Sequence, residues 1–305
     1  MKKTPVAIIL SVFLLQTGIA DESESKLTSE PWDKWAESYP SWVEAQPPFN
    51  IIDNIYYVGT KGIASYLITS NQGHILLDGG MPQNPPLIIN SIKALGFEPS
   101  DIKILLNSHA HFDHSGGLAE MKERTGAKLI ASALDVQWLE SGMYPGSDNL
   151  AYSSPAVLVD KKVVHEQLIA LGDITLKANI TPGHTPGCTS WSTSAKVASE
   201  EYQVLFFCSA SVAGNRLFGP PQYPGIVEDY RLTFERTRNW APDVFLSNHP
   251  FFFNMHAKRE KQLAGEKLAF VDRSGFPASI SELEVAFEKA LKAQLGKQKQ
   301  SSIDR

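Results

Sequence analysis

The chain has 305 residues, of which 43% are hydrophobic and 20% are charged, so it can bury one large core or two modest ones. Its formal net charge of −5 at pH 7 argues against a nucleic-acid-binding surface and against a polybasic membrane patch. After the first twenty residues, no segment is apolar enough to cross a bilayer.

The amino terminus has the pattern of a secretory signal peptide. Lys2 and Lys3 precede an apolar run over residues 6–15, and Gly18 and Ala20 supply small residues for cleavage before Asp21. The run is too short for a spanning helix, although an uncleaved anchor is the alternative. We therefore predict a signal peptide over residues 1–20 and a mature protein in the periplasm, without membrane contact after cleavage.

Residues 21–50 form an arm rich in aromatic side chains. Trp32, Trp35, Tyr39 and Trp42 recur at near-helical spacing. The ordinary interpretation is a packing or lid segment, and the sharper one is an arm that contacts the substrate. We place the main domain at residues 51–296 and a polar tail at residues 297–305.

Short strands and helices alternate through the main domain. The apolar, β-branched runs predict strands at residues 55–58, 65–68, 74–78, 102–106, 128–131, 174–180, 204–207 and 244–246. Helices are predicted at residues 85–96 and 116–125, and a capping box at Ser279–Glu282 predicts the start of a carboxyl-terminal helix. Residues 144–154 are rich in turn formers and predict a mobile loop or lid. This mixture favours one layered α/β domain.

Four potential metal ligands fall within six residues, in the segment His109-Ala110-His111-Phe112-Asp113-His114. The segment follows the predicted buried strand at 102–106, so we expect its ligands on the loop that leaves that strand. Imidazole nitrogens with one carboxylate suit a zinc-like divalent ion. His184 and His249 lie in similar contexts, in turns rich in Gly and Pro after predicted strands.

The chain has 2 cysteines, Cys188 and Cys208. An even count in an oxidising compartment favours a disulfide, and two buried thiols are the alternative.

The HxHxDH segment, the later Pro-Gly-His-Thr loop and the late histidine together resemble the metallo-β-lactamase superfamily. The resemblance extends from about Phe49 to Phe276. It implies an α/β protein with the four-layer αββα sandwich, in which the active site lies at one edge of the two packed sheets.

Within that superfamily the chain resembles the subclass B3 metallo-β-lactamases. All three histidines of the HxHxDH motif are present. The segment where glyoxalase II, ribonuclease Z and lactonase relatives carry a bridging carboxylate reads Phe207-Cys208-Ser209-Ala210-Ser211. Subclass B1 has a cysteine ligand where Ser209 aligns, so a register slip onto Cys208 would revive that alternative. The placement of Cys188 and Cys208 also resembles members with a disulfide in this region.

The resemblance implies two Zn²⁺ ions per chain. His109, His111 and His184 would bind the first, and Asp113, His114 and His249 would bind the second. Such a site hydrolyses the β-lactam amide by metal-activated hydroxide, which Asp113 orients, without a covalent acyl-enzyme. We therefore expect a zinc-dependent β-lactamase that confers antibiotic resistance, acting as a monomer on small molecules.

Other residues receive supporting roles from the same resemblance. Ser209 and Ser211 would contact solvent and the substrate carboxylate, with ordinary strand-end serines as the alternative. Asp78 would brace the metal loops, with a plain turn aspartate as the alternative. Phe112 either faces the cleft or packs. The remaining histidines singled out, for which we expect surface or turn positions, are His74, His165 and His256.

Two other functions stay open at this point. One is a hydrolase of the same superfamily acting on a thioester, lactone or phosphodiester, which the missing bridging carboxylate weakens. The other is a non-catalytic zinc-binding protein, which six intact ligands make a poor fit.

Overall fold

The computed structural model describes residues 32–144 and 153–303, with the backbone alone from residue 297 onward. The predicted signal peptide, the first part of the arm and most of the predicted lid at 144–154 lie outside the described residues. None of the helices in the described ranges is both long enough and apolar enough to span a membrane.

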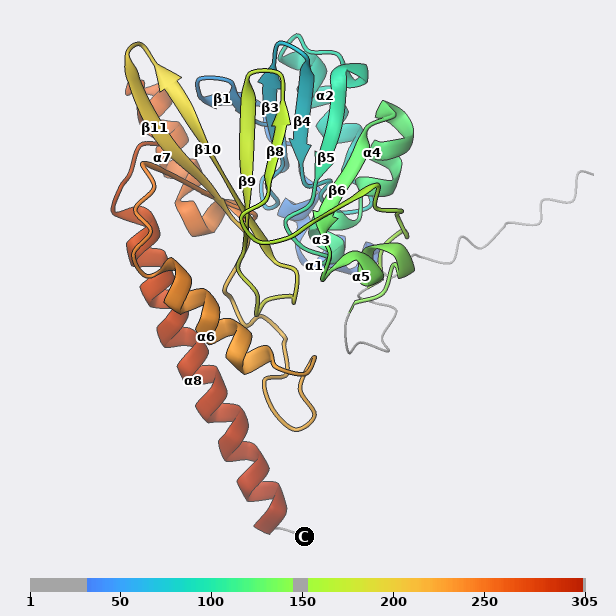
Figure 1. Ribbon diagram of the computed structural model, residues 1–305, viewed down its shortest axis with the longest axis vertical. Coiled ribbons are helices and arrows are strands. Elements are labelled where there is room, and N and C mark those ends of the chain that lie inside the picture. Colours follow the sequence, from blue (N-terminus) through green and yellow to red (C-terminus); the bar gives the residue numbers. More distant parts are fainter. Residues whose placement is uncertain (1–31, 145–152, 304–305) are drawn as a thin grey trace, which may run out of the picture.

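Two β-sheets form the centre of the molecule (Figure 1). The first has seven strands in sequential order, of which β4 to β7 are parallel to one another. The strands of this sheet are β1 (Phe49–Ile52), β2 (Ile55–Tyr57), β3 (Tyr66–Ser70), β4 (Gly73–Leu77), β5 (Ile102–Leu106), β6 (Lys128–Ser132) and β7 (Lys161–Val163). The second sheet has the order β12-β11-β10-β9-β8. Its strands are β8 (Leu168–Leu171), β9 (Ile174–Ile180), β10 (Thr189–Val197), β11 (Glu200–Phe207) and β12 (Val244–Ser247).

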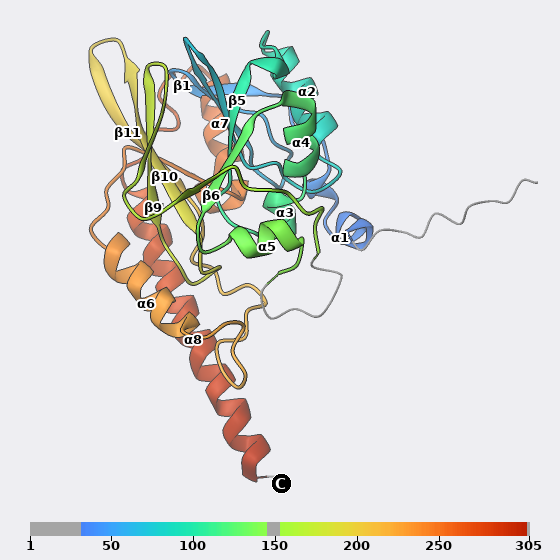
Figure 2. The same cartoon turned by 45° about the vertical axis from the view of Figure 1, so that its right-hand side comes forward.

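Helices cover the outer faces of both sheets, which gives the αββα arrangement (Figures 1 and 2). Helices α2 (Pro85–Ala94) and α4 (Leu118–Thr125) lie on the first sheet. Helix α6 (Ile226–Thr237) and the first half of α8 (Gly275–Ile303) pack against the second. The remaining helices are α1 (Asp33–Ser38), α3 (Phe112–Ser115), α5 (Val136–Ser141) and α7 (Met255–Leu263), with 3₁₀ turns η1 (Pro40–Trp42), η2 (Pro99–Asp101) and η4 (Pro250–Phe253). The predicted fold class is confirmed.

The main core lies between the two sheets and extends under α6 and α8. Tyr66 of β3 meets Phe206 of β11 edge to face, with ring centroids 5.0 Å apart. The Tyr66 hydroxyl donates to the carbonyl of Ser247 at the end of β12, at 2.6 Å. Burial of large aromatic side chains fixes how the two sheets are aligned, because few other arrangements would fill the same space.

The carboxyl-terminal helix differs from its prediction at both ends. It begins at Gly275 because the Asp272 carboxylate accepts the backbone N–H groups of Ser274 and Gly275, at 3.2 and 3.0 Å. The capping-box residues at 279–282 therefore lie inside the helix. The helix continues to Ile303, so most of the predicted polar tail at 297–305 is helical. This stretch consists mainly of Lys, Gln and Ser, which are compatible with a helix, and it contains no Pro that would break one.

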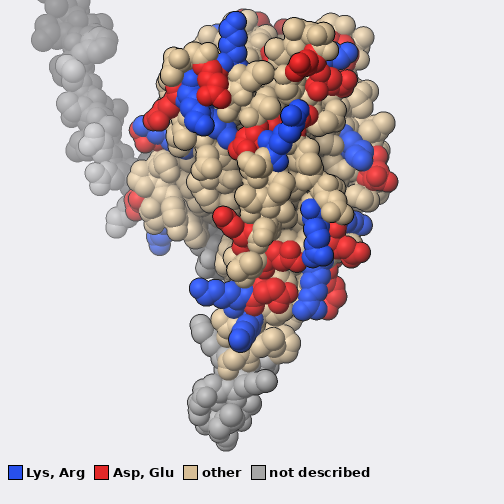
Figure 3. All heavy atoms as spheres, turned by 90° about the vertical axis from the view of Figure 1, so that its left-hand side faces the viewer, with Lys and Arg blue, Asp and Glu red and all other residues tan. Residues whose placement is uncertain are grey.

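Charged side chains of both signs are interspersed over the face shown in Figure 3, and neither sign forms a continuous field there. His74 differs from its prediction, because it is buried in β4 and packs edge to face against Phe97 at 5.1 Å. His165 and His256 are exposed, as expected.

Candidate metal centre

The carboxyl ends of β4, β5, β9 and β11 point to the same edge of the sandwich (Figure 1), and β12 runs parallel to β11. His109 and His111 follow β5, His184 follows β9, and His249 follows β12. Asp113 and His114 lie in the short helix α3, so only part of the motif is on the loop that the sequence predicted. Residue His111 has extended backbone (φ −84°, ψ 144°), and the chain turns into α3 directly after it.

The six predicted ligands gather into two neighbouring groups. One candidate ligand atom from each of His109, His111 and His184 lies within 4.8 Å of the other two. The second group, Asp113, His114 and His249, meets the same criterion. These are the two sets that the family resemblance implies, formed here by residues from three separate segments: 109–114, His184 and His249.

Hydrogen bonds orient two of the imidazoles. Nδ1 of His184 lies 2.7 Å from the carbonyl oxygen of Ser211, and Nδ1 of His249 lies 3.1 Å from that of Gly62. A carbonyl only accepts, so both Nδ1 atoms carry the proton and both Nε2 atoms keep a lone pair. A carbonyl partner of this kind is the usual support of a metal-binding histidine.

The donor set fits a divalent cation. Nε2 of His114 lies 3.3 Å from Nε2 of His249, and Oδ2 of Asp113 lies 3.1 and 3.5 Å from these two atoms. Nε2 of His109 is buried without a hydrogen-bond partner. Nitrogen lone pairs and a carboxylate turned toward one another are costly unless a cation stands among them. Zinc, which prefers nitrogen and carboxylate ligands, suits both groups.

Burial holds most of these imidazoles neutral. It lowers the pKa of His184 to about 4, and burial together with the neighbouring His114 lowers the pKa of His249 to about 4. Burial also lowers the pKa of His109 and of His111. For Asp113, burial would raise the pKa, but His114 and His249 hold it below the usual range. Neutral imidazole and ionised carboxylate are the forms that bind metal.

Asp78 holds the backbone that directly precedes His109. Its Oδ1 accepts the backbone N–H of Ser108 at 2.7 Å and the side-chain amide of Asn107 at 3.2 Å. Burial raises the pKa of Asp78 to about 6, although His114 and these hydrogen bonds oppose the rise. The backbone of Asp78 is left-handed (φ +62°), a conformation that Asp tolerates better than most residues. Asp78 thus braces the segment directly before His109.

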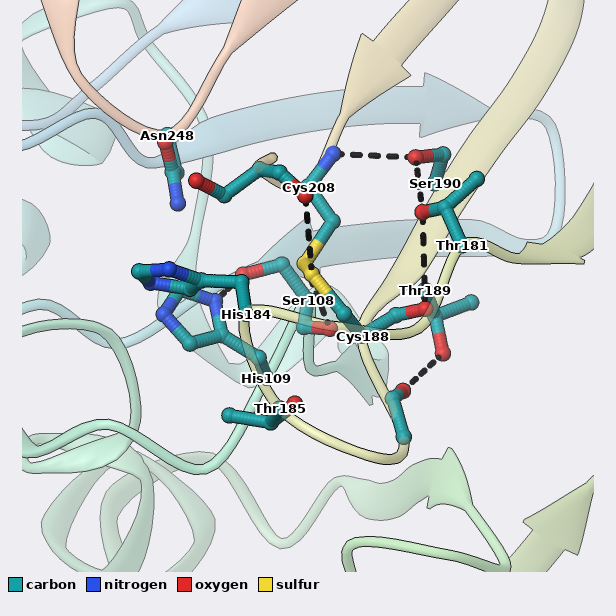
Figure 4. The surroundings of a disulfide bond; sticks show 12 residues. Ser108, His109, Thr181, His184, Thr185, Cys188, Thr189, Ser190, Cys208 and Asn248 are labelled. Atoms are coloured by element: carbon teal, nitrogen blue, oxygen red, sulfur yellow. Dashed lines mark hydrogen bonds between the residues drawn. A yellow bond between two sulfur atoms is a disulfide. The ribbon is translucent and has the colours of Figure 1, made fainter. Parts of the chain in front are cut away.

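The disulfide between Cys188 and Cys208 lies behind the first histidine group (Figure 4). Of the two alternatives that the sequence left open, the structure has the pairing, with Cα atoms 5.8 Å apart. The Cys208 N–H donates to Ser190 Oγ at 3.0 Å, and both sulfurs are buried. The bridge joins the start of β10 to the end of β11 and so connects the His184 segment to the Ser209 segment.

Ser209 and Ser211 follow β11, and the carbonyl of Ser211 contacts His184 of the first group. Their hydroxyls lie 3.1 Å apart, and both side chains line the site cavity. Among the described residues, the two groups contain a single carboxylate, that of Asp113.

A cavity of about 760 Å³ opens over both groups. Trp35, Tyr39 and Trp42 of the arm form one wall, stacked in sequence and tilted against Phe112. The Trp42 ring lies 5.7 Å from that of His249. The described part of the arm therefore lines the cavity, and Phe112 faces it.

Several lining residues escaped the sequence analysis. The Tyr144 ring stands over His111 at 4.3 Å, and its hydroxyl donates to Asn215 Oδ1 at 2.6 Å. Arg216 is the cation that lines the cavity among the described residues. Tyr144 is the first residue of the loop predicted at 144–154, but its contact with His111 was not predicted. Asn215 and Arg216 lie in no local motif, so the sequence carries no signal for them.

Comparisons with known proteins agree with this geometry. The family model described as the metallo-β-lactamase superfamily matches residues 58–249. The crystal structure of BJP-1, a subclass B3 metallo-β-lactamase of Bradyrhizobium japonicum, is 46% identical with a TM-score of 0.83, covering 85% of this chain and 98% of that chain.

Sequence relatives point to other hydrolases. The N-acyl homoserine lactonase AttM of Agrobacterium fabrum is 28% identical over 153 residues, which are 41% of this chain and span 57% of the lactonase. A hydroxyacylglutathione hydrolase of Bradyrhizobium sp. (strain ORS 278) is 25% identical over 222 residues, covering 71% of this chain and 72% of the relative.

Proposed function

Because the chain belongs to the metallo-β-lactamase superfamily, we propose that it hydrolyses the amide bond of β-lactams with two zinc ions. His109, His111 and His184 would hold one ion, and Asp113, His114 and His249 the other. The observation that carries the proposal is the convergence of these two groups. The residues that follow β11 nearby are Ser209 and Ser211, and not the bridging carboxylate of the other hydrolases.

Zinc, when bound, supplies Lewis acidity and makes hydroxide available near neutral pH. The protein residues provide the rest. The carboxylate of Asp113 accepts a hydrogen bond from the attacking water and orients it toward the lactam carbonyl. The hydroxyls of Ser209 and Ser211 donate to the substrate carboxylate, and Arg216 at the cavity wall adds a charge of opposite sign. No activated serine is required.

The aromatic wall of the cavity would bind the apolar side chain of the lactam. Trp35, Tyr39 and Phe112 present flat faces with few polar atoms, and such surfaces exclude water from one side of the site. We further propose that the mature chain acts in the periplasm as a monomer. The signal-peptide pattern and the disulfide support export to an oxidising compartment.

The test is a hydrolysis panel on purified protein with measured zinc content. We expect turnover of nitrocefin or a carbapenem, loss of turnover after chelation, and recovery with added zinc. An Asp113→Asn variant that retains zinc should lose most of the activity. Absence of β-lactam turnover in the zinc-loaded protein would refute the proposal.

The second candidate is hydrolysis of a lactone or a thioester. It is favoured by the lactonase and hydroxyacylglutathione hydrolase relatives. Turnover of an acyl homoserine lactone or of lactoylglutathione by the same zinc-loaded sample, without β-lactam turnover, would establish it in place of the first.

A further inference from the structure

Asp135 connects the two segments that carry the first histidine group, although it touches none of the six predicted ligands. It follows β6 and stands at the start of α5, where it is 1% exposed. Its Oδ2 accepts the backbone N–H of Ala110, between His109 and His111, at 3.0 Å. The same oxygen accepts the hydroxyl of Thr185, next to His184, at 2.8 Å.

The other carboxylate oxygen completes the connection. Oδ1 of Asp135 accepts the backbone N–H of Gly187 at 2.7 Å. A Cβ added at Gly187 would stand 2.6 Å from the Asp135 carboxyl carbon, so only glycine lets the backbone approach this closely. Three donors from two segments thus converge on one carboxylate, and no other described side chain receives hydrogen bonds from both segments.

Asp135 also lacks an ordinary counter-charge. No Lys or Arg within residues 32–144 and 153–296 forms an ion pair with it, and the three hydrogen bonds are the described polar contacts of its carboxylate. A buried carboxylate of this kind is tolerated when it accepts several strong hydrogen bonds and has positive charge nearby. The donors Ala110 and Thr185 are adjacent in sequence to the three histidines that are expected to hold the first cation.

We propose that Asp135 is a positioning residue that fixes the spacing between the His109–His111 segment and the His184 segment, and so sets the metal affinity of this histidine group. The proposal rests on the metal centre of the proposed function and is independent of the substrate. Residues that orient metal ligands typically contribute 10- to 100-fold in affinity.

The experiment compares Co²⁺ titrations of metal-free variants, followed by visible absorption. Asp135→Asn is nearly isosteric, but its amide nitrogen must face either the Gly187 N–H or the Ala110 N–H, so one backbone bond is lost. Thr185→Val removes one of the three donors and keeps the shape. His184→Ala and His249→Ala provide the references for loss of the first and of the second group. Leu139→Ala, which truncates a buried side chain of α5 away from the histidines, is the matched control for lost stability.

We expect Asp135→Asn to weaken Co²⁺ binding at the first group about 10- to 100-fold, with a spectrum like that of His184→Ala and unlike that of His249→Ala. Thr185→Val should give a smaller loss of Co²⁺ affinity at the same group. This variant serves as the test of the proposal if Asp135→Asn does not fold. Leu139→Ala should lower the melting temperature and keep both affinities.

The proposal is overturned if folded Asp135→Asn, or Thr185→Val in its place, binds Co²⁺ at both groups within about twofold of wild type, well inside the range expected for such residues. It is also overturned if Leu139→Ala loses the first group equally. A wild-type protein that binds two Co²⁺ ions but opens no β-lactam would refute the proposed function and leave this comparison intact.

Discussion

Single residues next to the metal ligands carry measurable electrostatic consequences, and Asp78 is the clearest case. In the metal-free protein its pKa is about 6, against about 3.9 in an unfolded chain. Between these values the folded state keeps a proton that the unfolded state releases. The contribution of Asp78 to stability therefore falls as the pH rises through this window.

Asp78→Asn removes this titration and keeps an acceptor for Ser108. We predict that the stability of metal-free wild type relative to the variant falls by about 2 kcal/mol between pH 4.5 and pH 7. Urea unfolding of both proteins across this range measures the difference, in which the titrations of the histidines that do not interact with Asp78 cancel. A difference that is flat or rises with pH would contradict the assignment.

At the scale of elements, the disulfide connects the ends of two segments that support the site. It closes a loop with a sequence separation of 20 residues, for which the chain-entropy model gives a stabilisation of roughly 3 kcal/mol. We predict a loss of this order in the Cys188→Ala/Cys208→Ala variant, measured by urea unfolding at fixed zinc. Excess dithiothreitol should lower the unfolding free energy of wild type toward that of the variant. A difference in unfolding free energy below about 1 kcal/mol between wild type and the variant would contradict the prediction.

The aromatic arm provides a second prediction at this scale. Trp35 and Tyr39 line the cavity, whereas the arm is anchored farther along, where the Trp42 carbonyl accepts Asn84 Nδ2 at 3.1 Å and Thr60 Oγ1 at 3.0 Å. The double variant Trp35→Ala/Tyr39→Ala should therefore keep the fold and zinc content. We expect KM to rise about 10-fold for β-lactams with an aromatic side chain, because the variant loses about 1–2 kcal/mol of binding free energy from contact with that side chain.

The matched control for the arm is a substrate pair that shares one lactam nucleus and differs in side chain. KM for the member with a small side chain should change less than twofold. Equal changes for both members would show that the arm acts on the fold and not on the substrate.

The elements that the sequence predicted well are those with an unambiguous local pattern. Strand β9 matches its prediction at both ends, because turn residues bound an apolar run. Helices α6 and α7 were not predicted, since their apolar positions are few and their burial comes from packing against α8 and η4. Strand β10 was missed as well, because its run of Ser and Thr acquires strand structure from pairing with β9 and β11.

At the scale of the whole molecule, the six predicted ligands could be found from sequence because each lies in a short motif after a strand. Their convergence depends on topology, which brings the carboxyl ends of β5, β9 and β12 to one edge. Asp135 and Arg216 lie in no motif, and only the folded chain brings them to the site. The sequence thus identifies the candidate ligands, and tertiary packing determines what surrounds them.

The same topology links metal binding to global stability. The two groups draw residues from three segments, which follow β5 of the first sheet and β9 and β12 of the second, so an ion held by either group binds the folded state and not the unfolded chain. Each ion should therefore stabilise the protein by about 2.7 kcal/mol when free zinc is 100 times its dissociation constant. We predict a melting temperature that rises with zinc, falls after chelation and is restored by zinc addition.

Variants separate this linkage from nonspecific metal effects. His184→Ala should lose the first increment of stabilisation and His249→Ala the second, whereas the exposed His256, in α7 and outside both groups, should be replaceable by Ala without effect on the zinc response. Differential scanning calorimetry across a zinc titration measures all three. The increments should also weaken as the pH falls toward 4, because protons then compete with zinc for the imidazoles of His184 and His249, whose pKa burial lowers to about 4. A melting temperature that does not respond to zinc would mean that the six side chains do not hold the ions together in the folded protein.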